Sequence, residues 1–453
     1  MTPTATIAAA RSCAYTVLRR VFERGAYADQ ALQAESKDLD QRDRALAMRL
    51  VYGTVQRCGT LDHVIAKLAD RPVARLDPPL LAALRLGLYE LLYLRGSPDY
   101  AVVADVVELA KGSARAGHGL VNAVLRRAAR EGPEALLGSL EDATPEQAAV
   151  KHSHPEWIAR LWWQELGAEQ ARALMAYDNE PGEVAVRANT LRSDTAALAA
   201  ELPVATHTDG EIPEALVLEE AFDVHGSPLW SAGAFIAQSR GAMLVARSLA
   251  PEPGERVLDL CAAPGGKSTH LAALMGDEGE VLAVEHDKAR AGALARTAQR
   301  LGASCVRVVI ADAAARRPEG AVFDRVLVDP PCSGLGTLQA RPDLRWRASA
   351  EGIAEMAAMQ ARILAAGADA LRPGGVLVYS TCTISPTENE RLIAAFLDSH
   401  RDFRLDDLAA ELPSHRMANA VAGDRNAVPP EFVLTLPHRD RTAGFFIARM
   451  RRS

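Results

Sequence analysis

The chain has 453 residues, of which 49% are hydrophobic and 24% are charged, and its formal net charge is −7. This length is too great for one compact core, so we expect a multidomain protein of two to four domains. The composition is typical of globular proteins, and the negative charge argues against nucleic-acid binding unless basic residues cluster locally.

The sequence also bears on compartment and metal binding. No apolar run is long enough to span a bilayer, and the first residues lack the basic and apolar segments of a signal peptide. The six cysteines are scattered without CxxC pairs. We therefore expect reduced thiols, a cytoplasmic protein, no metal site and no membrane partner.

Helical periodicity dominates the first third of the chain. Apolar residues recur at spacings of three and four between residues 5 and 135, as in the segment from Leu80 to Leu94. This period predicts an all-helical domain over residues 1–140. Four arginines lie along its first helix, and a solvated face is a simpler interpretation of them than a phosphate-binding face. They are Arg11, Arg19, Arg20 and Arg24.

Residues 141–240 change from a helical to a mixed pattern. The chain stays helical to about residue 180, and then Val184 to Leu191 alternates like a strand. A helix from Asp194 to Leu202 follows, with strand-like runs at Ala215 to Leu218 and at Ala234 to Ala237. We expect a helical linker and a small α+β module here.

Strands and helices alternate over residues 241–453, which predicts a Rossmann-like α/β domain with a parallel sheet. A long helix is expected from Ala350 to Leu371. The expected strands lie near Val257, Val281 to Val284, Val306 to Ile310, Val326 to Val328, Val376 to Tyr379 and Phe445 to Met450.

The motif VLDLCAAPGGK, from Val257 to Lys267, is the strongest local signal. It has the order strand, glycine turn, helix, and such turns open nucleotide-type sites at the carboxyl end of a parallel strand. The pattern is not GxGxxG, so a dinucleotide is disfavoured, and an ordinary strand-to-helix loop is the alternative.

Acidic residues follow the next three strands. Glu285, nineteen residues after Gly266, suits the two hydroxyls of a ribose, and Asp312 is placed to contact an adenine amino group. Asp329 ends the fourth strand. No phosphate-binding GxxxxGK[ST] motif is present, so S-adenosylmethionine, which has ribose and adenine but no phosphate, fits better than ATP or NAD.

Two cysteines follow neighbouring strands, Cys332 after Asp-Pro-Pro and Cys382 after Ser-Thr. A single cysteine at a strand end is most often a small buried residue. Two on the rim of one sheet suggest covalent catalysis, in which a thiolate adds to carbon 6 of cytosine and makes carbon 5 nucleophilic.

Three long motifs carry a resemblance to a known family. DLCAAPGGK (Asp259 to Lys267), DPPCSGLGTLQARPDLRWR (Asp329 to Arg347) and YSTCTISPTENE (Tyr379 to Glu390) resemble the RNA cytosine-C5 methyltransferases of the Sun/Fmu type. The helical N-terminal domain is similar to the RNA-binding NusB fold. This combination resembles the RsmB family of 16S ribosomal RNA methyltransferases over nearly the whole chain.

The resemblance implies a role for individual residues. It implies that Cys382 is the nucleophile, that Cys332 helps to release the product, and that Asp329 also lies near the base. The cofactor S-adenosylmethionine would be bound by Cys261, Ala262, Ala263, Pro264, Gly265, Gly266, Lys267, Glu285, Asp312 and Asp329. Lys267 is also our candidate for lowering the pKa of the nucleophile.

The implied partner is 16S ribosomal RNA, bound by a monomer. Because RNA is a polyanion, arginines must gather near the site, and we expect Arg341, Arg345 and Arg347 to contact it. Trp346 lies among them and is expected to pack.

Three alternatives remain. The chain would be a NusB-like RNA-binding or antitermination factor if the thiols had no role. It would act on another transfer or ribosomal RNA cytosine if only the target differed. In a DNA-type cytosine methyltransferase the nucleophile would be Cys332, and Cys382 would have no function.

Overall fold

The computed structural model describes residues 7–114, 116–220, 222–315, 322–415 and 431–453. The chain divides into two compact units. The helical unit consists of Met1–Glu180 with Leu338–Arg347, and the sheet unit consists of Pro181–Thr337 with Ala348–Ser453. In the ranges just given, no helix is long and apolar enough to cross a membrane.

The helical unit confirms the helices predicted from apolar periodicity. Its core is formed by the apolar faces of these helices, with Leu18, Leu50 and Leu61 fully buried. The two helices that follow residue 141 belong to this unit, so its boundary lies about forty residues beyond the expected one. The elements are α1 (Ala9–Arg24), α2 (Ala28–Glu35), α3 (Gln41–Gln56), α4 (Cys58–Ala69), η1 (Val73–Arg75), α5 (Pro78–Tyr93), α6 (Asp99–Ser113), α7 (His118–Leu137), α8 (Pro145–Lys151), α9 (Glu156–Tyr177) and α15 (Leu344–Arg347).

The expectation of a solvated arginine face on α1 is wrong for Arg11. Its side chain is buried, and its guanidinium donates to Glu90 at 2.7 and 2.8 Å and to Asp105 at 2.7 Å. The hydrogen bonds to Glu90 raise the pKa of Arg11 further above its usual value. Arg11 therefore joins α1 to α5 and α6 and is not available to solvent or phosphate.

The segment Leu338–Arg347 packs into the helical unit, although it is far away in sequence. Arg345 is fully buried, and its guanidinium donates to the carbonyl oxygens of Ser153 (3.0 Å) and Asp178 (3.2 Å) and to Asn179 Oδ1 (3.0 Å). Trp346 packs against the helical core, as expected, and donates to the Val55 carbonyl at 2.8 Å.

These contacts correct the expectation that Arg345 binds RNA. A guanidinium without solvent exposure cannot neutralise a phosphate. Its donors instead satisfy the carbonyl groups of Ser153, before α9, and of Asp178, directly after α9. Arg341 and Arg347 are exposed, and Arg347 stacks on the Tyr27 ring at 3.9 Å from its centroid.

The sheet unit begins with a small four-stranded antiparallel sheet in the order β2-β3-β1-β4. Three of its strands match the predicted ones. The strand β2 was not predicted, because its exposed Thr-His-Thr sequence lacks apolar alternation. The elements are β1 (Ala185–Ala188), α10 (Thr195–Glu201), β2 (Thr206–Thr208), β3 (Ala215–Leu218), α11 (Pro228–Ser231) and β4 (Phe235–Ala237).

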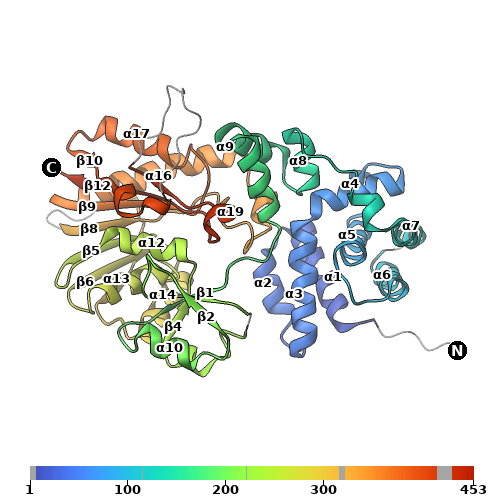
Figure 1. The fold of residues 1–453 in the computed structure, drawn as a ribbon, viewed down its shortest axis with the longest axis horizontal. Coiled ribbons are helices and arrows are strands. Elements are labelled where there is room, and N and C mark those ends of the chain that lie inside the picture. Colours follow the sequence, from blue (N-terminus) through green and yellow to red (C-terminus); the bar gives the residue numbers. More distant parts are fainter. Residues whose placement is uncertain (1–6, 115, 221, 316–321, 416–430) are drawn as a thin grey trace. The chain divides into compact units, whose positions relative to one another are not determined.

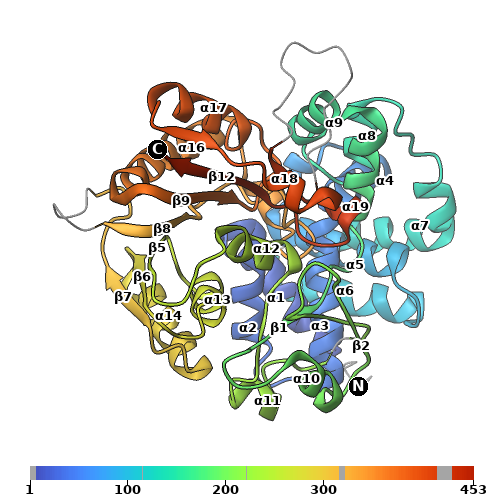
Figure 2. The same cartoon turned by 60° about the vertical axis from the view of Figure 1, so that its left-hand side comes forward.

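A second sheet forms the centre of this unit, and its described strands run in the order β10-β12-β9-β8-β5-β6-β7. Figure 2 shows this sheet from β12 to β7. The strands from β9 to β7 are parallel, as predicted. The expectation of a parallel sheet is wrong at one side, where β10, β11 and β12 pair antiparallel. The strands are β5 (Arg256–Leu260), β6 (Glu280–Glu285), β7 (Val306–Ile310), β8 (Phe323–Val328), β9 (Leu371–Thr381), β10 (Phe403–Leu405), β11 (Val433–Leu434) and β12 (Phe446–Arg452).

Helices cover both faces of this sheet. Figure 1 shows α16 and α17 on one face and α12, α13 and α14 on the other. The long helix predicted from Ala350 is confirmed, and it ends where β9 begins. The helices are α12 (Arg240–Leu249), α13 (Gly266–Leu274), α14 (Lys288–Leu301), α16 (Ala350–Ala370), α17 (Glu390–Ser399), α18 (Leu408–Glu411), η2 (Pro413–His415) and α19 (Pro437–Asp440).

Buried polar contacts fasten the small sheet to the large one. Arg187 of β1 donates to the Gly266 carbonyl at 2.7 Å and to Thr269 Oγ1 at 3.0 Å, so it holds the first turn of α13. Glu214 lies 2.6 Å from His270 Nε2, also on α13. Because burial disfavours an imidazolium, the pKa of His270 falls to about 4 and the ring is neutral at pH 7.

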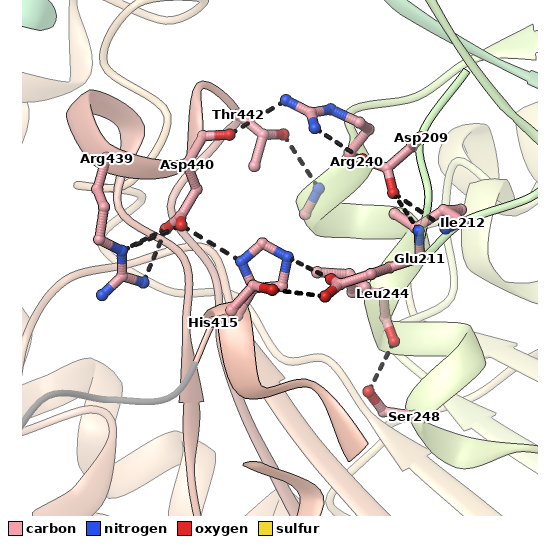
Figure 3. Close-up of polar contacts among 12 residues, drawn as sticks. Asp209, Glu211, Ile212, Arg240, Leu244, Ser248, His415, Arg439, Asp440 and Thr442 are labelled. Atoms are coloured by element: carbon pink, nitrogen blue, oxygen red, sulfur yellow. Dashed lines mark hydrogen bonds and ion pairs between the residues drawn. The ribbon is translucent and has the colours of Figure 1, made fainter. Parts of the chain in front are cut away.

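A second polar network joins the same two sheets near the end of the chain (Figure 3). Arg240 at the start of α12 donates to Asp209 at 2.7 Å and to the carbonyl oxygens of Asp440 and Arg441. His415 lies between Glu211, at 2.9 Å, and Asp440, at 3.3 Å. The α+β module is therefore an integral part of the sheet unit.

The role of Arg345 can be tested through stability. Arg345→Met should lower the free energy of unfolding by about 2–5 kcal/mol, because it leaves several buried carbonyls without a donor. The exposed Arg341→Met is the matched control and should change it by less than about 0.5 kcal/mol. Urea unfolding followed by tryptophan fluorescence measures both, and equal midpoints would contradict the structural role.

Candidate active site at the carboxyl edge of the large sheet

Parallel register brings the predicted site residues to one edge. Leu260 of β5 is paired with Val284 of β6 and with Val328 of β8, and Val328 is paired with Tyr379 of β9. The residues that follow these strands therefore share the carboxyl edge of the sheet, where ligands bind in open α/β folds. Cys261, Glu285, Asp329 and Cys382 all lie there, as predicted from the sequence.

The glycine turn leads from β5 into α13. Gly265 precedes the first residue of the helix and has φ 102°, a conformation that favours glycine. A Cβ atom at this position would lie 2.6 Å from Leu294 of α14, so glycine is also required for packing. Cys261 begins the turn, and burial raises the pKa of its thiol to about 12. Cys261 is therefore protonated at neutral pH.

Glu285 ends β6 with a buried carboxylate. Its Oε1 accepts from the Asp287 amide at 3.0 Å and lies 3.0 Å from His286 Nδ1. Its Oε2 is buried, accepts no hydrogen bond, and lies 3.5 Å from Arg290 Nη2. A carboxylate that accepts hydrogen bonds through one oxygen and none through the other suits a ligand hydroxyl.

Asp312 lies after β7, where the third strand was expected to end. Its carboxylate is exposed and accepts from the Ala314 amide at 2.9 Å. The residue before it, Ala311, donates its backbone amide to the Glu285 carbonyl at 3.1 Å. Asp312 and Glu285 therefore follow adjacent strands at the same edge.

Lys267 and Asp329 form an ion pair in the middle of the edge. Lys267 Nζ lies 2.7 Å from Asp329 Oδ2, and Ser380 Oγ donates to Asp329 Oδ1 at 2.8 Å. Burial opposes the charge of the ammonium, but Asp329 more than compensates and raises the pKa of Lys267. The ammonium also lies 5.0 Å from the centroid of the Phe445 ring. Lys267 is therefore a fixed positive charge.

The two predicted thiols meet beside this pair. Cys332 Sγ and Cys382 Sγ are 3.3 Å apart, and both side chains are half-buried free thiols. The hydrogen bond with Cys382, together with burial, raises the pKa of Cys332 well above its usual value. Cys332 is therefore protonated at neutral pH, and either sulfur can donate its S–H to the other.

Sequence reasoning did not single out two polar residues of this site. Ser380 contacts Asp329, and Glu388 hydrogen-bonds to Ser333 beside Cys332. Both lie in YSTCTISPTENE, but an acid near a helix start is usually solvated, so burial of Glu388 had no signal in the sequence. Within the residues that the structure describes, no group of three or more His, Cys, Asp or Glu is arranged to hold a metal.

Family models match three consecutive parts of the chain. Residues 8–130 match the NusB family, residues 154–225 match a ferredoxin-like domain of RsmF/B-like methyltransferases, and residues 246–451 match the family described as 16S rRNA methyltransferase RsmB/F. These matches confirm the predicted combination of an all-helical NusB-like domain, an α+β module and a methyltransferase sheet.

Curated relatives match along the whole chain. The probable ribosomal RNA small subunit methyltransferase B of Synechocystis sp. is 36% identical, over 98% of this chain and 99% of the relative. That of Bacillus subtilis is 34% identical, over 98% of both chains. The chain belongs to the ribosomal RNA small subunit methyltransferase B family. It is therefore a member of a family of RNA methyltransferases, as its motifs predicted.

Solved structures support the same fold. The crystal structure of PH0851 covers 98% of this chain and 99% of its own, with a TM-score of 0.77 and 26% identity. A methyltransferase homolog protein from Pyrococcus horikoshii covers 69% of this chain and all of its own, with a TM-score of 0.61 and 27% identity.

Asp259, inside β5, gives a pH test of the site's framework. It is buried, accepts from Ser268 Oγ at 2.6 Å, and burial raises its pKa to about 7. A pKa raised on folding gives a stabilisation that is complete below the unfolded value of about 3.9 and is lost as pH rises through 7.

Between pH 5 and pH 8 we expect the free energy of opening of the β5 amides, measured by hydrogen exchange, to fall by on the order of 1–3 kcal/mol. Asp259→Asn does not titrate at this position and should not show this fall. The exposed Asp398→Asn is the control and should follow the unmodified chain. A parallel pH dependence in all three proteins would show that Asp259 does not titrate in this range.

Proposed function

We propose that this chain transfers a methyl group from S-adenosylmethionine to carbon 5 of a cytosine in 16S ribosomal RNA, through a covalent bond between Cys382 and carbon 6. The observation that carries the proposal is the pair of thiols 3.3 Å apart beside the Lys267–Asp329 ion pair. A single cysteine would be explained by packing. Two cysteines in contact at the ligand-binding edge of a methyltransferase sheet support a role in covalent catalysis.

The residues of the edge fit the proposed cofactor. Glu285 Oε2 is a buried acceptor without a hydrogen bond, and it can accept from a ribose hydroxyl. Asp312 would contact the adenine, and residues 261–267 would bind the remainder. S-adenosylmethionine supplies an electrophilic methyl group when bound.

The charges around the thiols favour Cys382 as the nucleophile. Cys332 keeps its proton at neutral pH, so its S–H can stabilise a thiolate on Cys382. Lys267 is a fixed ammonium close enough to interact with Cys382. The opposite assignment, with Cys332 as the nucleophile, requires ionisation of a thiol whose pKa is raised by burial and by the hydrogen bond with Cys382.

The proposed steps use these groups in order. The Cys382 thiolate bonds to carbon 6, and the electron pair of the 5,6 double bond makes carbon 5 nucleophilic. After carbon 5 is methylated, a base removes its proton, the double bond re-forms, and the bond from sulfur to carbon 6 breaks to return the thiolate. Cys332, in contact with Cys382, assists this last step.

The RNA partner is supported by the family and by the N-terminal match to the NusB family. Arg341 and Arg347 remain candidates for RNA contact because they are exposed, whereas Arg345 is not. Free thiols at the reaction centre need a reducing compartment, so we place the enzyme in the cytoplasm.

The cofactor assignment can be tested at Glu285. Glu285→Ala should weaken S-adenosylmethionine binding by about 10- to 100-fold, since a hydrogen bond to a charged group contributes about 1.5–3 kcal/mol. The exposed neighbour Lys288 gives the control Lys288→Ala, which should bind normally. Titration calorimetry measures both variants, and unchanged affinity in Glu285→Ala would refute the ribose contact.

The two thiols can be distinguished by trapping RNA. Cys382→Ala should abolish methylation and leave no protein joined to RNA, because no adduct forms. Cys332→Ala should form the adduct and methylate carbon 5, then fail to release, giving a slow band on a denaturing gel. Cys305→Ala, a cysteine outside the edge, should behave like the unmodified chain.

The reverse pattern, with trapping in Cys382→Ala, would support the DNA-type scheme. Full activity in both variants would mean that catalysis is not covalent. A chain that binds RNA but never methylates it would be the antitermination-type binder.

A further inference from the structure

The loop that carries Cys332 is hydrogen-bonded on both sides of the cysteine. Glu388, which has no solvent exposure, accepts from the Ser333 amide at 2.9 Å through Oε1 and from Ser333 Oγ at 2.5 Å through Oε2. Gln360 of α16 donates to the Pro331 carbonyl at 2.9 Å and to Glu388 at 3.0 Å. The residues before and after Cys332 are thus bound to one buried carboxylate and its partner amide.

The residues around Cys382 are hydrogen-bonded to Asn389, which follows Glu388 in the chain. Thr381 Oγ1 donates to Asn389 Oδ1 at 2.5 Å, and Asn389 Nδ2 donates to the Thr383 carbonyl at 2.9 Å. Thr381 and Thr383 flank Cys382. Asn389 is buried as well, so water does not compete for these bonds.

A direct contact joins the two loops. Ser333 Oγ and Thr383 Oγ1 are 2.6 Å apart, one residue beyond each cysteine. Tyr379 O–H donates to the Glu388 carbonyl at 2.7 Å and ties this residue to β9. The 3.3 Å separation of the two sulfurs is therefore set by a network centred on adjacent residues of the chain.

We propose that Glu388 and Asn389 are positioning residues that keep the two thiols in contact. Glu388 positions the loop of Cys332, and Asn389 positions the residues on both sides of Cys382. The assignment of the two residues to the two half-reactions rests on the proposed function. Neither residue touches the reacting base in this scheme; each acts through the loop it holds.

Burial of a carboxylate supports a role beyond stability. A buried charge costs more to desolvate than an apolar residue of similar size, so Glu388 is a poor choice for filling space. Its negative charge is also among the causes that raise the pKa of Cys332, after the hydrogen bond to Cys382 and burial. It thus helps to keep Cys332 as the protonated thiol.

The positioning role can be measured without RNA. Diamide accepts one hydrogen atom from each of two thiols and leaves a disulfide, whose sulfurs must approach to about 2.0 Å. The rate of the Cys332–Cys382 disulfide, followed by the loss of 2 Da and by peptide mapping, reports how often the sulfurs meet. Glu388→Ala should form it at least about fivefold more slowly, because the loop is released.

Two variants control this measurement. Glu388→Gln retains the acceptor oxygen and a polar partner for Ser333 and should restore most of the rate. The exposed Glu355→Ala on α16 should not change it. Circular dichroism and S-adenosylmethionine calorimetry check that each variant is folded. If Glu388→Ala does not fold, Ser333→Ala removes the same hydroxyl contacts from the loop side and should also slow the reaction.

The two half-reactions should then respond separately. With both cysteines intact, Glu388→Ala should accumulate protein joined to RNA, because product release is slowed, whereas Asn389→Ala should form less adduct than the unmodified chain. A merely structural defect would lower both steps together.

Cys332→Ala is the reference for the trapping assay. If it traps no RNA, the proposed function fails, and the disulfide rate still decides the positioning role. An unchanged or faster disulfide rate in Glu388→Ala overturns the positioning role, whatever the trapping assay shows. A slower rate that Glu388→Gln restores supports it.

Discussion

Parallel hydrogen bonding of β8 between β5 and β9 is the constraint on which the candidate site depends. Its register pairs Val328 with both Leu260 and Tyr379, so three segments remote in sequence end side by side. A one-residue shift would turn the side chains of a strand to the opposite face. The approach of Cys332 to Cys382 follows from this pairing, because each thiol lies only a few residues beyond its strand.

Burial and neighbouring groups set the charge of Lys267, Cys261 and Cys332 at this edge. Lys267 is kept positive by Asp329, whereas burial and hydrogen bonding keep Cys261 and Cys332 protonated. Cys382 is then the thiol with both a donor and a positive charge nearby. A nucleophile needs this kind of asymmetry, because two identical thiols in contact would otherwise share the negative charge.

Two arginines that the sequence places on exposed surfaces are buried in the structure. Arg11 and Arg345 both lie in basic stretches that are typical of exposed or RNA-binding surfaces, yet both are buried. Arg11 neutralises two carboxylates from other helices, and Arg345 donates to carbonyls of distant loops. A guanidinium has five donors, so it can satisfy several buried acceptors at once, and local sequence does not reveal where those acceptors lie.

The sequence by itself determined the helices of the N-terminal part, the order of strands and helices in the sheet unit, and the family, because apolar periodicity and three long motifs are local properties. It also placed Glu285, Asp329 and both cysteines at the carboxyl edge, since parallel strands end together. It did not predict β2, the antiparallel side of the large sheet, or the inclusion of residues 338–347 in the helical unit. Those features, and the burial of Glu388, depend on contacts between segments far apart in the chain. Only the tertiary structure decides such contacts, because their free energy depends on which surfaces meet and exclude water.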